Sequence, residues 1–271
     1  MSSERPDAAG VPATESDRIG AARGMRFLGV PVETHESLGS TNDEAFRRAE
    51  EGAPEGLVVL ARHQTAGKGR LGRTWFDHPD RSLMFSILLK PTIPLPSYSL
   101  LSLTLASSIA AAASIMASAI TIKWPNDVLQ GGKKFCGVLA ESRALRPGEA
   151  PVLVLGAGIN VGYSEEDFPP EFRATATSLT THDGARPDMG ELLSKILGHF
   201  GHELAMLEER GMIDLLRFLG SRMPKPGSPV RVVLPDRVVE GEYVSLTVTG
   251  ALQVRNASTG AVETLTAGVM Q

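Results

Sequence analysis

Residues 62–75 read Arg-His-Gln-Thr-Ala-Gly-Lys-Gly-Arg-Leu-Gly-Arg-Thr-Trp, and the interpretation of the chain starts from this stretch. A backbone so rich in glycine leaves N–H groups free to close on an anion, and the cations between the glycines can neutralise it. The apolar residues 57–61 before it read as a strand, so the loop begins at a strand end. Taken alone, the stretch fits a phosphate-binding loop and a flexible basic turn equally well.

Two familiar families share its G-x-G-x-x-G spacing, but their context is missing. A dinucleotide-binding loop opens directly into a helix, whereas this loop runs into the turn-like residues 73–80 and then an apolar strand at 82–89. A protein kinase needs His-Arg-Asp and Asp-Phe-Gly segments, which the sequence lacks. A Walker-type phosphate loop is also absent.

Composition bounds the class of protein. The 271 residues allow one large domain and a small one, and the net charge of −4 argues against a broad nucleic-acid or membrane footprint. The one cysteine excludes an intrachain disulfide and points to a reducing, cytoplasmic location. We interpret Cys136 as a small buried apolar residue and His199 and His202 as solvated side chains, so we predict no metal site built from protein ligands alone.

One charge-free segment, residues 91–122, could be mistaken for a membrane span. It contains prolines near its start and many Ser, Thr and Ala residues after them. We expect an Ala-rich buried helix over about residues 100–119 instead, and no membrane association.

The chain divides into three parts. Residues 1–24 predict a disordered tail, residues 25–223 a main domain, and residues 224–271 a small β module that follows a Pro- and Gly-rich breaker. Within the main domain, Thr41 with Glu44 reads as a capping box that starts a helix ended by Gly52. Further helices are expected from Asp188 and over residues 212–222. Residues 133–142 and 151–161 read as an antiparallel strand pair.

Several polar groups in the sequence indicate a single binding site. Lys68, Arg70 and Arg73 offer a receptor for a polyanion, and Lys134 adds a charge at the start of a strand. Asn126 and Asn160 end strand-like runs, where their carboxamides could hold a base or a metal-bound phosphate. No nucleophile–base pair stands out. Such a site suits phosphate-ester or anhydride chemistry between two bound substrates, in which the protein positions them and stabilises charge.

In combination the motifs resemble those of the biotin–protein ligases. The resemblance covers about residue 25 to the C-terminus. It rests on Ser40-Thr41-Asn42, Gln64-x-x-Gly-Lys-Gly-Arg-x-Gly-Arg-x-Trp75, Lys123-Trp-Pro-Asn-Asp127, Lys134-x-x-Gly137 and Gly156-Ala-Gly-Ile-Asn160.

The resemblance implies an α+β fold: a mixed sheet with flanking helices, related to class II aminoacyl-tRNA synthetases, plus a small C-terminal SH3-like β-barrel. It implies that biotin attacks ATP, with Mg²⁺ present, to form biotinyl-AMP. A lysine of a biotin carboxyl carrier domain, as in acetyl-CoA carboxylase, then accepts the biotinyl group. A homodimer formed through the sheet is compatible with it.

It also implies roles for individual residues. The expected catalytic residues are Lys134 and Arg70. The expected biotin-binding residues are Ser40, Thr41, Asn42, Gln64, Lys68, Gly69, Arg70, Lys134 and Gly137. The expected ATP-binding residues are Arg70, Arg73, Trp75, Asn126 and Asn160, and for Trp75 and Trp124 core packing is an equal alternative.

Two departures from the family pattern matter. Lys68 stands where the family usually has Arg, which keeps the charge but loses bidentate geometry. Residues 1–24 show no helix-turn-helix, so we expect no repressor activity and no specific nucleic-acid partner. Two rival functions stay open: a lipoate–protein ligase of the same fold, and a non-catalytic biotin-binding regulatory protein.

Overall fold

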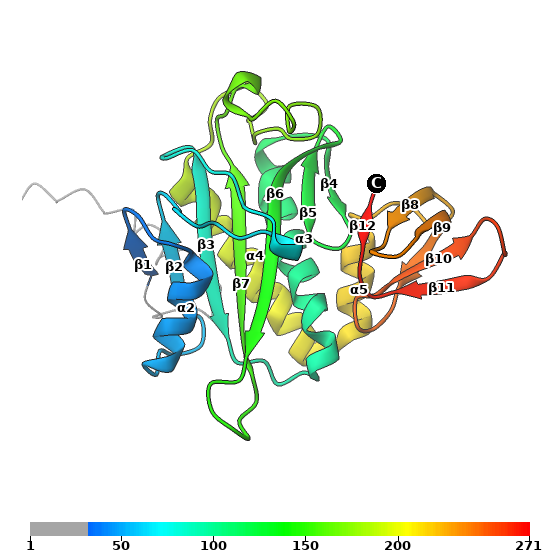
Figure 1. Ribbon diagram of the computed structural model, residues 1–271, viewed down its shortest axis with the longest axis horizontal. Coiled ribbons are helices and arrows are strands. Elements are labelled where there is room, and N and C mark those ends of the chain that lie inside the picture. The colour runs from blue at the N-terminus through cyan, green and yellow to red at the C-terminus, as the bar shows by residue number, and fades with distance from the viewer. Residues whose placement is uncertain (1–31) are drawn as a thin grey trace, which may run out of the picture.

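The computed structural model describes residues 32–271, so the predicted tail at 1–24 lies outside the described residues. A central mixed sheet forms the body of the molecule, helices cover both of its faces, and a small second sheet lies beside it (Figure 1). This arrangement confirms the predicted α+β architecture with a C-terminal β module. The division into residues 25–223 and 224–271 stays a prediction.

The central sheet has seven strands in the order β1-β2-β3-β7-β6-β5-β4. Only the pair β1–β2 is parallel. The central strands β3 and β7 are buried along their whole length, which is why both read as continuous apolar runs. The strands are β1 (Val32–His35), β2 (Val58–Ala61), β3 (Ser82–Leu89), β4 (Ile120–Lys123), β5 (Asp127–Gln130), β6 (Lys133–Arg143) and β7 (Val152–Asn160).

Helix α2 (Thr41–Glu50) covers part of one face. It packs Ala45, Phe46 and Ala49 against β2, β3 and β7. The other face carries α3 (Tyr98–Met116) and α4 (Met189–Arg210), which lie behind the sheet in Figure 1. Helix α5 (Met212–Gly220) packs against these two helices on the side of the small C-terminal sheet. Because α2 reaches only half of its face, the face of β5, β6 and the end of β7 is left to loops, and the site forms there.

Helix α3 is the predicted Ala-rich helix, and it is almost entirely buried between the sheet and α4. Within the described residues, the segment Leu95–Met116 is the single one long and apolar enough to cross a membrane, but 78% of its most apolar 18-residue window is buried inside the fold. Its small side chains let neighbouring elements approach on all sides, so its apolar character is that of a core helix.

The predicted start of α2 is wrong by one residue. The N-cap is Ser40, whose carbonyl oxygen accepts from the Glu44 N–H at 3.1 Å. Thr41 cannot cap the helix because its N–H and hydroxyl both donate to Gln64 Oε1, at 2.7 and 3.2 Å. The helix start expected at Asp188 is confirmed, since the Asp188 carboxylate caps α4 by accepting from the Glu191 N–H at 2.8 Å.

The C-terminal module is a five-stranded sheet in the order β11-β10-β9-β8-β12. Its strands are β8 (Pro229–Val233), β9 (Val238–Leu246), β10 (Leu252–Asn256), β11 (Val262–Leu265) and β12 (Val269–Met270). It docks on the main body through backbone carbonyls. Gly250 O accepts from the Trp124 indole at 3.0 Å, and Thr249 O accepts from the Ser99 hydroxyl at 2.7 Å.

A carboxyl group lies deep in the packing between α3 and α4. Glu203 is only 1% exposed, and one carboxylate oxygen accepts from the Ser107 hydroxyl at 3.4 Å. The other oxygen has no hydrogen-bond partner among the described residues. Burial raises the pKa of Glu203 to about 8, although the Arg222 guanidinium opposes the shift.

This carboxyl group predicts a stability that falls with rising pH. The folded protein holds the Glu203 proton between its unfolded pKa of 4.5 and its folded pKa of about 8, so stability is lost as pH rises through that window. Glu203→Gln should remove the loss. At each pH, the free energy of unfolding of Glu203→Gln is compared with that of wild type. Because each pKa unit is worth about 1.4 kcal/mol, this difference should be about 3 kcal/mol more favourable to the variant at pH 8 than at pH 5.

Urea unfolding at the two pH values measures this difference. Glu209→Gln, at an exposed position of the same helix, is the matched control. Equal effects of the two substitutions at both pH values would contradict the assignment.

Candidate active site

The register of the central sheet assembles the site. A cross-strand row runs through Met84, Gly158, Gly137 and Asp127, which are paired in succession across β3, β7, β6 and β5. The next row on the same face pairs Ser86 with Gly156. Segments far apart in sequence therefore meet on one face, and the middle of that face carries no side chains.

The glycines form the floor of a small, partly open cavity. A Cβ atom on Gly156 would lie 2.2 Å from Asn42 Oδ1, and one on Gly158 would lie 2.4 Å from Cε2 of Trp75. Any side chain there would collide with the groups above it. The cavity is small, about 30 Å³, which leaves room for little more than a water molecule. Its lining is Ser40, Thr41, Asn42, Gln64, Lys68, Trp75, Gly137, Leu139, Gly156, Ala157 and Gly158.

The polar wall of the cavity is a hydrogen-bond network around the start of α2. Gln64 Oε1 accepts from Thr41, while its amide nitrogen contacts only the thioether of Met84, at 3.3 Å, which is a weak acceptor. The Asn42 amide donates to the Glu141 carboxylate at 2.7 Å and accepts from the Ser86 hydroxyl at 2.6 Å. The network fixes the rotamers of Thr41, Asn42 and Gln64 before any ligand arrives.

Ser86 and Glu141 are absent from the sequence-based site. Ser86 is completely buried on β3, and its hydroxyl lies 2.8 Å from Thr41 Oγ1 and 2.6 Å from Asn42 Oδ1, so its one proton lies between two acceptors. A serine in the middle of an otherwise apolar strand was the available signal. Glu141 gave no comparable signal, because its contact with Asn42 spans 99 residues. Asp127, quoted as a motif residue without a role, forms the Lys134 ion pair.

Lys134 lies at the rim of the cavity. Its ammonium is 2.6 Å from Asp127 Oδ1 and 5.7 Å from the centroid of the Trp75 ring. A Cβ on Gly137, which lines the cavity, would be 2.9 Å from that ammonium. The cavity and the cation therefore share a wall.

A β-bulge turns Lys134 towards the site. Residues three apart on a regular strand point to opposite faces, which would separate Lys134 from Gly137. The register between β5 and β6 shifts at Val128 and Leu129, which pair with Cys136 and Lys134. The extra residue, Phe135, points into the core, and Lys134 reaches the face of Gly137.

The glycine-rich loop folds over the site as a narrow hairpin. Gly69 N–H donates to Arg73 O at 2.7 Å, and Trp75 N–H donates to Gly67 O at 2.9 Å. Lys68 forms an ion pair with Asp43 at 2.5 Å. Both partners are substantially exposed, so this pair contributes at most about 1 kcal/mol. The Lys68 side chain is therefore a weak tether for the tip of the loop.

Trp75 is the part of the loop that fills the cavity. Its indole lies against Gly137 and Gly158, and its N–H is buried without a hydrogen-bond partner among residues 32–271. A buried donor left unpaired costs about 1–3 kcal/mol. A ligand with an acceptor oxygen would remove that cost.

The predicted phosphate-binding residues lie on the Asp127 side of the cavity. Arg70 Nη1 donates to Asn126 Oδ1 at 3.0 Å, and the Asn126 amide donates to Val138 O at 2.5 Å. Asn160 is on the cavity face two residues beyond Gly158, and its amide donates to Thr177 O at 3.0 Å. The exposed Arg73 side chain makes no hydrogen bond or ion pair with the described part of the chain. Trp124 is buried in the core and does not line the cavity.

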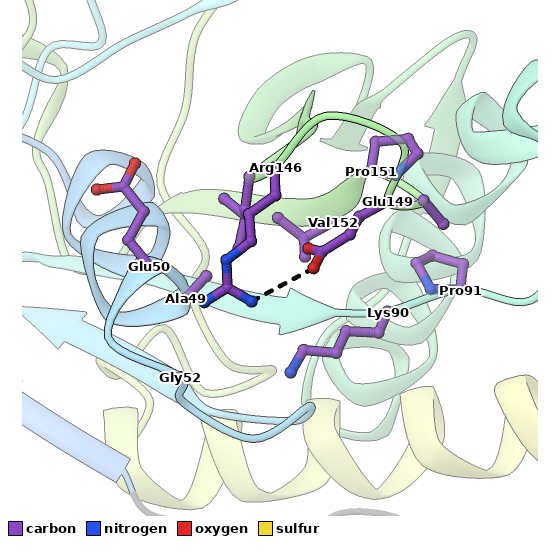
Figure 2. A pocket seen from close by; sticks show the side chains of 11 residues that line it. Ala49, Glu50, Gly52, Lys90, Pro91, Arg146, Glu149, Pro151 and Val152 are labelled. Atoms are coloured by element: carbon purple, nitrogen blue, oxygen red, sulfur yellow. Dashed lines mark hydrogen bonds and ion pairs between the residues drawn. The ribbon is translucent and has the colours of Figure 1, made fainter.

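Two other features of the surface resemble binding sites. A larger depression of about 400 Å³ lies at the opposite end of β7, between the end of α2 and the turn after β6 (Figure 2). Its charges are mixed, and Arg146 is paired with Glu149 at 3.3 Å. Glu33, His35 and Glu44 lie close enough to hold a cation, but Arg48 already lies 2.7 Å from Glu33 and 3.1 Å from Glu44. The Arg48 guanidinium therefore already balances the charge of both carboxylates in this cluster.

Comparison with known proteins relates this chain to one family of ligases. The model of the biotin/lipoate A/B protein ligase family matches residues 35–160. The biotin–[acetyl-CoA-carboxylase] ligase of Mycobacterium tuberculosis is 35% identical over 224 residues, which are 80% of this chain and 78% of that protein. The bifunctional ligase/repressor BirA of Bacillus spizizenii is 38% identical over 163 residues, or 59% of this chain. The match spans about half of that relative, 49% of its length.

A solved structure agrees with the sequence relatives. The biotin protein ligase of Aquifex aeolicus, in complex with biotin and ATP, superposes with a TM-score of 0.73 at 28% identity. The match covers 89% of this chain and 97% of that one.

The glycine floor predicts a specific response of the Trp75 indole. Gly158→Ala places a methyl group inside the ring volume, so the indole must leave the cavity at a cost of about 1–3 kcal/mol in unfolding free energy. The fluorescence of this variant should shift to the red as Trp75 meets water, because Trp124, the other tryptophan, stays buried.

Emission spectra of the folded variants test this response. Gly39→Ala is the control, since a Cβ there meets nothing within 4 Å. The same spectrum for both variants would show that Trp75 does not rest on Gly158.

Proposed function

This chain belongs to the biotin–protein ligases of the biotin/lipoate A/B protein ligase family, and from that membership we propose that it activates biotin with ATP and transfers it to a lysine of a biotin carboxyl carrier domain. The reaction has two halves. The first makes biotinyl-AMP and releases pyrophosphate, and the second makes an amide and releases AMP. By analogy with the named relatives, the carrier domain would be that of acetyl-CoA carboxylase.

One observation carries the proposal: the polar cavity and the Lys134 ammonium share Gly137 as a wall. A ring bound beside Thr41 and Gln64 would direct its carboxylate past Gly137 to the Lys134 ammonium. The same ammonium lies against Asp127, next to Asn126 and Arg70. A carboxylate on one side and a polyphosphate on the other would therefore meet at Lys134.

The geometry suits an in-line displacement with no covalent enzyme intermediate. A carboxylate oxygen of biotin attacks the α-phosphorus of ATP, and the bond from phosphorus to the pyrophosphate oxygen breaks. Both reactants are anions, so their approach is opposed by charge repulsion. The Lys134 ammonium reduces this repulsion and stabilises the charge that develops on the phosphoryl oxygens. Arg70 adds a second cation on the phosphate side.

In the second half, the amine of the acceptor lysine attacks the acyl carbon of biotinyl-AMP. The bond from that carbon to the phosphate oxygen breaks, and AMP leaves with the electron pair. Until the acceptor arrives, the mixed anhydride must be kept from water, and the loop at residues 62–75 is the element that can cover it. Because its tether through Lys68 and Asp43 is exposed and weak, we expect this loop to open easily.

The residues near the phosphates fit Mg²⁺. This ion is usually held by one or two carboxylates together with substrate phosphates. Asp127 supplies one carboxylate and Asn126 one amide oxygen on the phosphate side of the cavity. We propose that Asp127 and Asn126 hold Mg²⁺, which would neutralise phosphate charge. A homodimer and a cytoplasmic location stay predictions.

Biotin-dependent exchange of labelled pyrophosphate into ATP tests the first half-reaction. We expect exchange with biotin and none with lipoate. Lys134→Ala should lower it by at least about a hundredfold, since removing one electrostatic stabiliser of a transition state costs about that much. Lys133→Ala is the matched control: it removes the same charge from the neighbouring residue, whose ammonium instead donates to Arg173 O at 3.0 Å.

The outcomes separate the rival functions. Exchange with lipoate in place of biotin would identify a lipoate–protein ligase. Biotin binding without any exchange would leave a non-catalytic binding protein. Equal losses in the two lysine variants would remove Lys134 from the proposed mechanism.

A further inference from the structure

The small C-terminal sheet reaches the active site through the carbonyl of Gly268. This oxygen accepts hydrogen bonds from both terminal nitrogens of Arg70, each at 3.4 Å. The two residues are 198 positions apart, and Arg70 belongs to the glycine-rich loop. The loop that covers the site is therefore attached to the second sheet as well as to the body of the protein.

Arg70 is a bridge between three parts of the fold. Besides Gly268 it contacts Asn126, which lies in the turn between β4 and β5. Burial lowers the pKa of the Arg70 guanidinium, while the Asp127 carboxylate opposes that shift. A partly buried guanidinium needs hydrogen-bond acceptors, because it has donors only. The Gly268 carbonyl supplies one of the two acceptors found for it among the described residues.

The carbonyl is held by a rigid element. Strand β12 follows Gly268 directly and pairs with Val232 and Val233 of β8. The Gln271 N–H donates to Arg231 O at 2.7 Å. Gly268 itself has φ of +128°, and a Cβ there would lie 2.9 Å from side-chain atoms of Val232 and Leu234. Only glycine fits this backbone, so the direction of the carbonyl is set by the sheet.

We infer that the Gly268 carbonyl is a positioning group for Arg70, and that through it the small sheet sets how firmly the loop closes over the activated intermediate. The inference rests on the proposed function for the identity of that intermediate. The contact lies on the phosphate side, away from Thr41 and Gln64. Its loss should therefore speed the escape of biotinyl-AMP and leave the binding of biotin alone unchanged.

Gly268→Ala is the direct test, because the added Cβ forces the carbonyl to move. The escape of biotinyl-AMP is measured by trapping released adenylate with hydroxylamine in the absence of an acceptor. We expect release about tenfold faster than wild type, since a hydrogen bond to a charged group is worth about a factor of ten or more. The affinity for biotin without ATP and the thermal unfolding midpoint are measured on the same samples.

Two matched controls separate the positioning of Arg70 from a general loosening of the small sheet. Gly260→Ala also adds a Cβ at a positive φ, +71°, in the turn between β10 and β11 of the same sheet, but there the Cβ meets nothing within 4 Å. Ser99→Ala removes the hydrogen bond to Thr249 O and weakens the docking of the sheet without touching Arg70. Faster release in Gly268→Ala alone supports the inference, and equal release in all three variants overturns it.

A second measurement covers the case in which Gly268→Ala does not fold. Coupling through a contact is reciprocal, so loss of the Arg70 guanidinium should loosen the strand that follows Gly268. Hydrogen exchange at the amides of residues 269–271 should be several-fold faster in Arg70→Ala than in Arg73→Ala. The latter removes the same charge from the same loop without a contact to the small sheet. No difference between the two variants would overturn the inference.

The two measurements also distinguish this inference from the proposed function. If wild type forms no adenylate, the proposed function fails, while hydrogen exchange still tests the link between Arg70 and Gly268. If wild type forms and retains adenylate but Gly268→Ala behaves like Gly260→Ala, the function stands and the positioning role fails.

Discussion

The structure depends on the cross-strand pairing of two glycines, Gly137 on β6 and Gly158 on β7. At this place the sheet has no side chains on one face, so the Trp75 indole can lie directly on the backbone. The neighbouring position, Gly156, lets Asn42 approach in the same way. A single methyl group at either floor position of β7 would push these groups away. The flat floor therefore makes the cavity possible, and the register of the strands puts Asp127 and Lys134 beside it.

The site combines a rigid floor with a weakly held cover. The floor and polar wall belong to buried strands and to a network that links Ser86, Asn42 and Glu141 across the sheet. The cover is a glycine-rich hairpin held by an exposed ion pair and by the contacts of Arg70. Since the cavity is too small for a fused-ring ligand, the Trp75 end of the cover has to move for the proposed substrate, biotin, to enter. A stiff receptor under a mobile cover suits an enzyme that must admit two substrates and protect a reactive product.

Much of this arrangement could be predicted from the sequence, because its motifs lie at strand ends and tight turns with strong local signals. Such signals predict the buried helix α3 and the strands at 82–89, 133–142 and 151–161. They also predict that one site brings together Lys134, Asn126 and Asn160. The N-cap of α2 is Ser40 and not the predicted Thr41, because the N–H and the hydroxyl of Thr41 both donate to Gln64. Local capping rules cannot include such a long-range contact. The bulge that turns Lys134 inward, the support from Glu141 and the contact of Gly268 with Arg70 depend on register and on residues far apart in the chain. The two-residue strand β12 is too short to leave a pattern.

The most direct test of the account is the mass of a carrier domain after incubation with this protein, ATP, Mg²⁺ and biotin. The account predicts that a biotin carboxyl carrier domain gains the mass of one biotinyl group, on its acceptor lysine. A carrier domain with arginine at that position should gain nothing, and omission of ATP should abolish the gain. An unchanged carrier mass, with protein that binds biotin and is fully folded, would contradict the assignment of this chain as a ligase.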